Sequence, residues 1–413
     1  MTKRIICAFA AAIAVAAFAA TAARASSTML VGLNDEANTL YGDPTTAFPL
    51  LDQLHNQVIR VNLYWGGTKY AVANSKPTTD ATDPSDPAYD WTIYDRLVRY
   101  AAQHDEAVMF SILFTPSWAN GGKPRTQPPT KFQDLADFAH AAMTRYSGYW
   151  TPPAWQRDPT NASTGSTLPR VSLWTAWNEP NNPVFLTPQY QRVGKTWVIQ
   201  SAVNYSKICN AVYTGIKSVE KYPGAGPIPG VQVACGVTAP RGNNQPTSTR
   251  PSVSPVAFLR ACKRYGLKTF DVWAHHPYYD KPTETPAFRP SKKSTAVELG
   301  NIDVLLTELS RLYGPKHLWI TEYGYQTRPQ DKTFGVTWTQ QAAYLRQAYT
   351  IAHKNPRIDM FLWFLLKDDT KVSGWQSGLL TARGQKKPSF NVFASLPRFL
   401  ASPILEELAR GTG

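Results

Sequence analysis

Clustered charge is missing from this sequence. Only 17% of its 413 residues are charged, and no run of Lys and Arg is longer than a pair such as Lys292-Lys293. A groove for nucleic acid needs basic side chains gathered on one face, so we expect no nucleic-acid partner. Basic residues do outnumber acidic ones and give a formal net charge of +14. That excess would suit an anionic glycan, but we favour the simpler explanation that it keeps the protein soluble.

Long apolar runs are also missing, except at the N-terminus. Lys3 and Arg4 precede an alanine-rich apolar run over residues 5–20, and a small-x-small segment follows at residues 23–25. This order is typical of a bacterial export signal, so we expect residues 1–25 to be cleaved. A membrane anchor is the alternative, although the run is short for a bilayer span. Cleavage removes three basic residues and lowers the net charge from +14 to +11. We therefore expect a secreted protein, extracellular or associated with the cell wall, without stable membrane association.

Cysteine is scarce. Cys7 lies in the expected signal, which leaves Cys209, Cys235 and Cys262, an odd number for an exported chain. At most one bridge can form within the chain. We expect Cys209 and Cys262, on successive predicted helices, to be the pair, and three buried free thiols are the alternative. None of these cysteines has the spacing of a metal site.

The remaining sequence alternates strand-like and helix-like segments. Apolar runs predict strands at 28–33, 57–65, 107–114, 171–177, 231–237, 269–274, 317–321 and 358–366. Helical spacing predicts helices at 48–55, 91–104, 132–146, 188–221 with an interruption allowed, 256–265, 297–313, 339–353 and 389–400.

Eight strand and helix units are typical of a parallel sheet closed into a (β/α)8 TIM barrel of the α/β class. We expect one domain over residues 26–400, followed by a tail at 401–413. An open doubly wound sheet is the alternative, but it would usually carry a glycine-rich phosphate turn after its first strand. Residues 33–37 offer no such turn.

Polar and aromatic residues collect where the predicted strands end. In a barrel of this type the C-terminal strand ends converge on one face, where catalytic groups gather. The residues at these ends are Arg60, Trp65, Trp118, Asn178, Glu179, His275, His276, Tyr278, Glu322, Trp363, Asp368 and Asp369.

Two of these residues, Glu179 and Glu322, form a pair of carboxylates suited to cleaving a glycosidic bond. One carboxylic acid protonates the leaving oxygen, and the other carboxylate attacks or supports the sugar carbon. Each residue alone could be an ordinary acid, at a helix start or in a turn. Their joint position at strand ends favours the catalytic interpretation. A separation of about 5–5.5 Å would give retention of configuration, and about 6.5–9.5 Å would give inversion.

The segment Trp177-Asn178-Glu179-Pro180-Asn181, with Thr321-Glu322-Tyr323-Gly324 on a later strand, resembles the clan A glycoside hydrolases. These are retaining enzymes on (β/α)8 barrels, and the likeness covers nearly the whole mature chain. Strands six and eight are similar to family 5, whereas Thr115-Pro116-Ser117-Trp118 and the Trp-Asn-Glu-Pro-Asn segment are more similar to family 39. The histidine that family 5 shows on strand three is missing, which argues against cellulase-type specificity.

The resemblance implies a role for each matching residue. Glu179 would be the acid/base and Glu322 the nucleophile. Asn178 would hydrogen-bond the sugar 2-hydroxyl, and Arg60 and Tyr278 would hold Glu322. His276 matches the histidine two residues before that tyrosine, and Trp363 matches a tryptophan that floors the subsite of the cleaved sugar.

Other candidates have two interpretations. Trp65, Trp118 and Trp375 are either sugar platforms or packing residues, and Asp368 is either a subsite ligand or a loop charge. One of His275 and His276 is expected to be structural. We expect a monomer that acts on a carbohydrate without cofactor or metal. Transglycosylation by the same site and a non-catalytic glycan-binding barrel are the alternatives.

Overall fold

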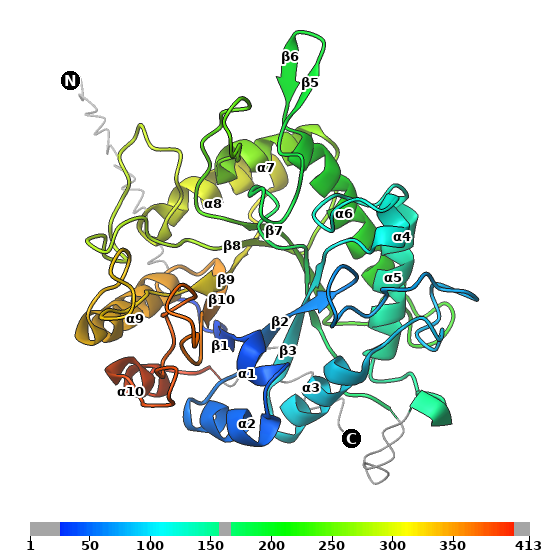
Figure 1. Ribbon diagram of the computed structural model, residues 1–413, viewed down its shortest axis with the longest axis horizontal. Coiled ribbons are helices and arrows are strands. Elements are labelled where there is room, and N and C mark those ends of the chain that lie inside the picture. Colours follow the sequence, from blue (N-terminus) through cyan, green and yellow to red (C-terminus); the bar gives the residue numbers. More distant parts are fainter. Residues whose placement is uncertain (1–24, 157–166, 400–413) are drawn as a thin grey trace, which may run out of the picture.

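The protein folds into a closed eight-stranded parallel barrel (Figure 1), seen in a computed structural model that describes residues 25–156 and 167–399. Residues 1–24 of the expected export signal and the expected tail lie outside the described residues. The barrel strands are β1 (Leu30–Asn34), β2 (Val58–Tyr64), β3 (Ala107–Leu113), β4 (Leu173–Ala176), β7 (Gln232–Thr238), β8 (Val272–His275), β9 (Leu318–Tyr323) and β10 (Ile358–Trp363). Because β1 pairs in parallel with both β2 and β10, the sheet closes, and the predicted fold class is confirmed.

Helices surround the barrel on its outer side (Figure 1). They are α2 (Pro44–Gln53), α3 (Thr92–Gln103), α5 (Phe132–Arg145), α6 (Gln200–Lys217), α7 (Pro255–Arg264), α8 (Ile302–Tyr313), α9 (Trp338–His353) and α10 (Pro388–Ala394). Short helical turns at α1 (Glu36–Thr39), α4 (Ser117–Asn120), η1 (Ala154–Gln156) and η3 (Leu299–Asn301) lie in the connections. Within the described part of the chain, no helix is long and apolar enough to cross a membrane.

The predicted helix at 188–221 is wrong in its first part. Residues before α6 form a small antiparallel hairpin, β5 (Gln191–Val193) and β6 (Thr196–Val198), which projects away from the barrel in Figure 1. Gly194 at the turn has a φ of 60°, a conformation that ends a helix, and the flanking residues Val193, Thr196 and Val198 are β-branched. Local turn chemistry therefore overrides the helical spacing here.

Two apolar layers hold the barrel together. The inner layer fills the barrel with side chains from all eight strands. They include Leu30, Val58, Met109, Leu173, Ala234, Val272, Trp319 and Met360. The larger layer lies between the strands and the helices and includes Val31, Leu33 and Trp363. Successive residues of a strand thus face opposite layers, which decides which side chains can reach the barrel mouth.

The expected Cys209–Cys262 bridge is wrong. Cys209 on α6 is bonded to Cys235 on β7, with 6.1 Å between their Cα atoms, and Cys262 is buried as a free thiol. The helix α6 packs against both β7 and α7, so the neighbouring elements alone do not decide the partner. Cys235 faces the outer apolar layer from β7 and is bonded to Cys209 there, which leaves Cys262 on α7 as a free thiol.

Candidate active site

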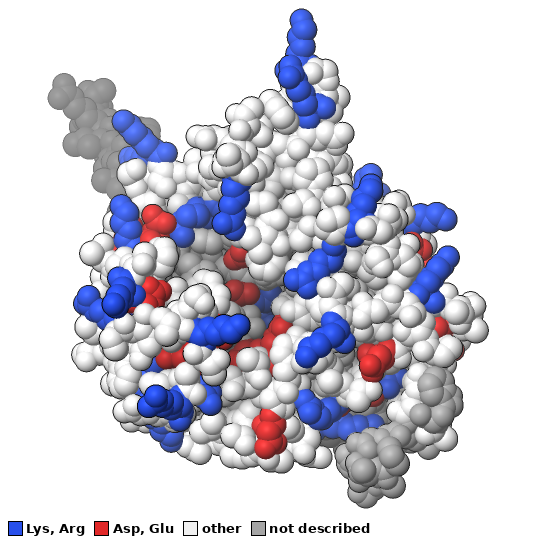
Figure 2. All heavy atoms as spheres, in the orientation of Figure 1, with Lys and Arg blue, Asp and Glu red and all other residues white. Residues whose placement is uncertain are grey.

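A cavity of about 930 Å³ opens at the C-terminal ends of the barrel strands. Its wall includes Asn178, Glu179 and Glu322 from the predicted site, together with Tyr278. In Figure 2 acidic side chains gather in the central hollow of this face, while Lys and Arg are spread over the surface around it. The charge inside the hollow is therefore of the opposite sign to the net charge of the chain.

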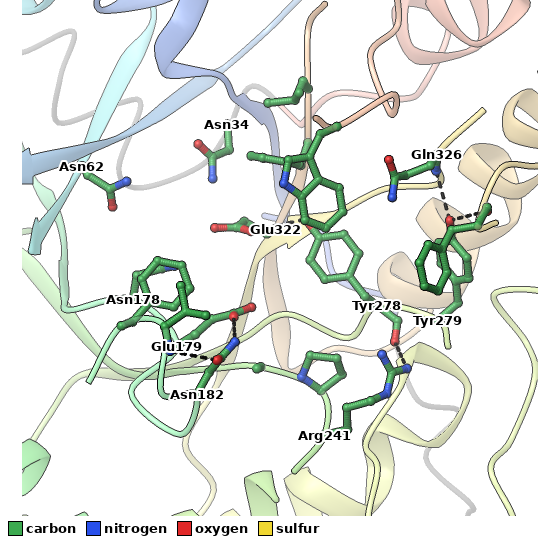
Figure 3. A pocket seen from close by; sticks show the side chains of 18 of the residues that line it. Asn34, Asn62, Asn178, Glu179, Asn182, Arg241, Tyr278, Tyr279, Glu322 and Gln326 are labelled. Carbon is green, nitrogen blue, oxygen red and sulfur yellow. Dashed lines mark hydrogen bonds between the residues drawn. The ribbon is translucent and has the colours of Figure 1, made fainter. Parts of the chain in front are cut away.

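The segment that carries Glu179 leaves β4 through an unusual backbone. Trp177 and Glu179 have φ angles of 69° and 38°, a region that non-glycine residues seldom adopt. The amide of Glu179 donates to the carbonyl of Val237 at the end of β7, at 2.8 Å. Such backbone strain concentrates at functional sites, and here it turns the Glu179 side chain into the cavity (Figure 3).

Glu322 is held by two hydrogen-bond donors. Arg60 Nη1 lies 2.5 Å from Glu322 Oε1, and the Tyr278 hydroxyl donates to Oε2 at 3.2 Å. Burial acts to raise the pKa of Glu322, but the charges of His276 and Arg60 and these hydrogen bonds outweigh it and place the pKa below its ordinary value. The carboxylate is therefore kept ionised, as an attacking group requires.

Arg60 links three strands at this point. It is 1% exposed, and its other nitrogens donate to Asn178 Oδ1 at 2.7 Å and to Ser111 Oγ at 2.9 Å. The guanidinium thus orients the Asn178 amide while it holds Glu322, and the buried cation has the partners that its burial demands.

His276 lies between the two carboxylates. Its Nδ1 is 3.1 Å from Glu179 Oε1 and 3.7 Å from Glu322 Oε2, and its Nε2 is 3.0 Å from Thr321 Oγ1. One oxygen of Glu179 lies within 4.8 Å of one oxygen of Glu322. The two acids thus lie side by side in the same part of the cavity. On the other side of Glu179, Asn182 Nδ2 donates to Oε2 at 3.0 Å (Figure 3).

The trio of Glu179, His276 and Glu322 also has the spacing of a metal site, since one ligand atom of each lies within 4.8 Å of the others. However, Arg60 and Tyr278 already donate to the two oxygens of Glu322. A guanidinium beside a divalent cation would be strongly unfavourable in a buried site. The donor set fits a pair of acids for proton transfer and attack better than a metal centre.

The other histidine of the pair, His275, has a structural position. It is fully buried, with Nδ1 2.8 Å from Thr238 Oγ1 and Nε2 3.0 Å from the Val297 carbonyl. Burial lowers its pKa to about 3, so it stays neutral.

Three predicted tryptophans do not reach the cavity. Trp363 is fully buried, faces the helices and donates from its indole to the Ser377 carbonyl at 2.9 Å, because Met360 and Leu362 take the inward positions of β10. Trp65 likewise points outward from β2 and packs edge-on against Trp118. Trp375, the third predicted sugar platform, does line the cavity, and Phe364 is among the other aromatic residues there.

Asp368 is also outside the cavity. It is 4% exposed and forms an ion pair with Lys387 at 2.7 Å, and its Oδ1 accepts from the Gly378 amide at 2.8 Å. These contacts hold the loop that follows β10, so Asp368 supports the loop that bears Trp375 and does not contact the cavity.

Several cavity residues were missed from the sequence. Asn34 ends β1, and Glu36 opens α1, where it accepts from the Asn62 amide at 2.8 Å, Tyr64 at 2.9 Å and Tyr41 at 3.0 Å. A signal for Asn62 did exist, because it stands two residues after Arg60 on β2 and therefore faces the same side. Asn34 and Glu36 could have been found in the same way, as polar residues where the first strand ends.

Comparisons with solved structures show the same fold. The neighbours include a family 39 glycoside hydrolase from Bacteroides cellulosilyticus WH2, with a TM-score of 0.57, 18% identity and coverage of 92% of this chain and 64% of that one. A glucosidase from Croceicoccus marinus has a TM-score of 0.58, 14% identity and coverage of 90% and 65%. A GH39 enzyme from Xanthomonas axonopodis pv. citri has a TM-score of 0.52, 17% identity and coverage of 91% and 67%. The chain thus spans about two-thirds of these proteins, and the expected resemblance is confirmed at the level of the fold.

Sequence comparison gives less. The profile of a family of unknown function (DUF5722) matches residues 243–400, which is less than half of the chain. A search of curated proteins found no match.

Proposed function

We propose that the protein is a secreted glycoside hydrolase that cleaves O-glycosidic bonds with retention of configuration. The observation that carries this proposal is the pairing of Glu179 and Glu322, with one oxygen of each within 4.8 Å. Retaining enzymes hold their two carboxyl groups about 5–5.5 Å apart, whereas inverting enzymes leave space for a water molecule between them. The fold shared with a family 39 glycoside hydrolase and a glucosidase supports the same reaction class.

In the first step, Glu322 attacks the anomeric carbon and forms a covalent bond to the sugar. At the same time Glu179 gives its proton to the glycosidic oxygen, so that the bond to the leaving group breaks. Arg60 keeps Glu322 ionised before the attack. Asn178, fixed by Arg60, offers its amide nitrogen to a hydroxyl of the reacting sugar.

In the second step, the ionised Glu179 takes a proton from water. The hydroxide oxygen then bonds to the anomeric carbon, and Glu322 leaves as a carboxylate. His276 lies within hydrogen-bond reach of Glu179 and can donate to it while that residue is ionised. Two inversions at one carbon give net retention.

The test begins with a screen of aryl glycosides and defined polysaccharides. Glu322→Gln and Glu179→Gln should each lower kcat at least about 10³-fold, while the cooperative thermal unfolding of the protein stays intact. With Glu179→Ala, added azide should restore turnover and give a glycosyl azide of retained configuration, followed by NMR. Unchanged turnover by Glu322→Gln on the best substrate would refute the proposal.

The two alternatives give different results in the same assays. A transglycosylase would release mainly sugar-to-sugar products when acceptor is in excess. A glycan-binding barrel would bind a glycan without releasing any product.

A further inference from the structure

The Asn34 side chain is buried in the cavity wall but has no partner. It is 5% exposed and lines the cavity, and no hydrogen bond to its amide is found within the described part of the chain. Figure 3 shows this amide pointing into the cavity on the side of Glu322. Because no group of the described chain occupies this amide, a ligand hydroxyl can bond to it without displacing an internal partner.

The neighbouring amides in this wall each have at least one side-chain partner, which sets Asn34 apart. Asn62 Nδ2 donates to Glu36, while Asn62 Oδ1 has no partner in the described part of the chain. Glu36 accepts from Tyr41, Tyr64 and Asn62. Asn178 Oδ1 accepts from Arg60. The amide of Asn34 is therefore the group in this wall whose oxygen and nitrogen are both left for a ligand, among the residues described.

The position of Asn34 is fixed from both sides. On β1, Leu30 faces the barrel interior, so Asn34, four residues later, faces it too, and it pairs in register with Arg60 on β2. The next residue, Asp35, accepts from the Leu366 and Lys367 amides at 3.1 and 3.2 Å and caps α1 through the Asn38 amide. Because the backbone on each side of Asn34 is held, its side chain is preorganised for binding.

We propose that Asn34 is a specificity-determining residue that binds two neighbouring hydroxyl groups of the sugar in the subsite beside Glu322. Its carbonyl oxygen accepts from one hydroxyl, and its amide nitrogen donates to the other. The substrate class is then a sugar ring with a free vicinal diol, in addition to the hydroxyl at Asn178. This inference rests on the proposed function and adds a recognition role that the two carboxylates do not supply.

The test is a set of double-mutant cycles on the aryl glycoside that the wild type cleaves fastest, with analogues that each lack one hydroxyl. Asn34→Ala should lower kcat/KM on the parent sugar about tenfold or more. On the two analogues that lack either hydroxyl of the diol, the same substitution should cost less than about threefold, because its partner is already gone. Asn34→Ser, which keeps a small polar group, replaces the alanine variant in the same cycles if that variant does not fold.

Asn56→Ala is the matched control. It removes an amide of the same size at the opposite end of the barrel, just before β2, and should leave the ranking of the analogues unchanged. An equal cost of Asn34→Ala on the parent and on every analogue, or no cost on the parent, would overturn the inference.

The same cycles are repeated in the Glu322→Gln background, where calorimetry measures the binding of the parent sugar and its analogues with and without Asn34→Ala. This tests the inference without turnover. If the wild type cleaves glycosides but the coupling is absent, the inference alone fails. If no glycoside is cleaved but the coupling appears in binding, the proposed function fails and the role of Asn34 stands. If no sugar binds, both are overturned.

Discussion

Trp375 stacks on Tyr278, with ring centroids 5.9 Å apart and planes inclined by 28°. Trp375 is 44% exposed at the rim of the cavity, whereas Tyr278 reaches Glu322 with its hydroxyl. One aromatic stack therefore runs from the surface of the protein to the carboxylate proposed to attack the sugar.

Replacing Trp375 with alanine should weaken substrate binding more than catalysis. A sugar ring stacked on Trp375 at the rim would lose a contact worth about 0.5–1.5 kcal/mol. KM should therefore rise about 2–10-fold, with kcat changed less than about threefold. Trp375→Phe keeps a ring and should retain most of the affinity. Steady-state kinetics on an oligosaccharide check this, and a fall in kcat at constant KM would instead assign Trp375 to the positioning of Tyr278.

Replacing Arg60 with methionine should shift the pH dependence of the reaction. Burial raises the pKa of Glu322, whereas the charge of His276 and the charge and hydrogen bond of Arg60 lower it, so that the pKa lies below its ordinary value. Without Arg60 that pKa rises, so the acidic limb of the kcat/KM profile should move to higher pH. The maximal rate should also fall about 10²-fold or more.

Arg145→Met is the control for this change. Arg145 is likewise buried in an ion pair, with Asp95 at 2.5 Å, but it lies on α5 outside the cavity. Its replacement should lower the unfolding temperature and leave the acidic limb in place. An unmoved limb in the Arg60 variant would contradict the role given to Arg60.

Replacing Asp35 with asparagine should change how stability depends on pH. Burial raises the pKa of Asp35 from 3.8 to about 6, against the hydrogen bonds that lower it. A raised folded-state pKa means that the stabilisation is complete below pH 3.8 and is lost as the pH rises through about 6. The stability of Asp35→Asn relative to the wild type should therefore increase between pH 4 and 7, by at most about 3 kcal/mol.

The measurement is urea unfolding of both proteins across that range. Other groups also make stability depend on pH, and His275, with its lowered pKa, makes it rise with pH. Their contributions are the same in both proteins and cancel in the difference. A difference that does not vary with pH would show that folding does not raise the pKa of Asp35.

Reducing agent should destabilise the protein through the Cys209–Cys235 bridge. The bridge closes a loop of 26 residues, for which a loss of about 2–4 kcal/mol is expected. Cys262→Ala should remain sensitive to reductant, whereas the Cys209→Ala, Cys235→Ala double variant should not. Thermal unfolding with and without reductant checks this, and the reverse pattern would point to a bridge with Cys262.

The barrel and its central acids could be predicted because they depend on local signals. Each strand is a short apolar run, and Glu179 and Glu322 lie at or just beyond the C-terminal ends of two such runs. Arg60 is similarly visible, since a cation within an apolar strand needs a buried partner. The structure brings these three residues together with Asn178, His276 and Tyr278.

What could not be predicted depends on which face of a strand each residue takes and on packing between distant segments. Trp363 and Phe364 are adjacent in the sequence, yet Trp363 faces the helices and Phe364 faces the cavity. The bridge partner of Cys209 is decided by how α6 lies against β7, and the hairpin at 191–198 by one glycine turn. Such features follow from the register of the folded barrel, which apolar spacing alone does not give.

The closure of the barrel by β1 between β2 and β10 also makes activity a reporter of folding. Arg60 lies on β2, Asn178 in the segment that follows β4, and Glu322 on β9, so their hydrogen-bonded contact joins segments that are far apart in sequence. Contacts of this range form late, because long loops must close first. After dilution from denaturant, the rate at which sugar-releasing activity returns would therefore measure the rate at which the barrel finishes folding.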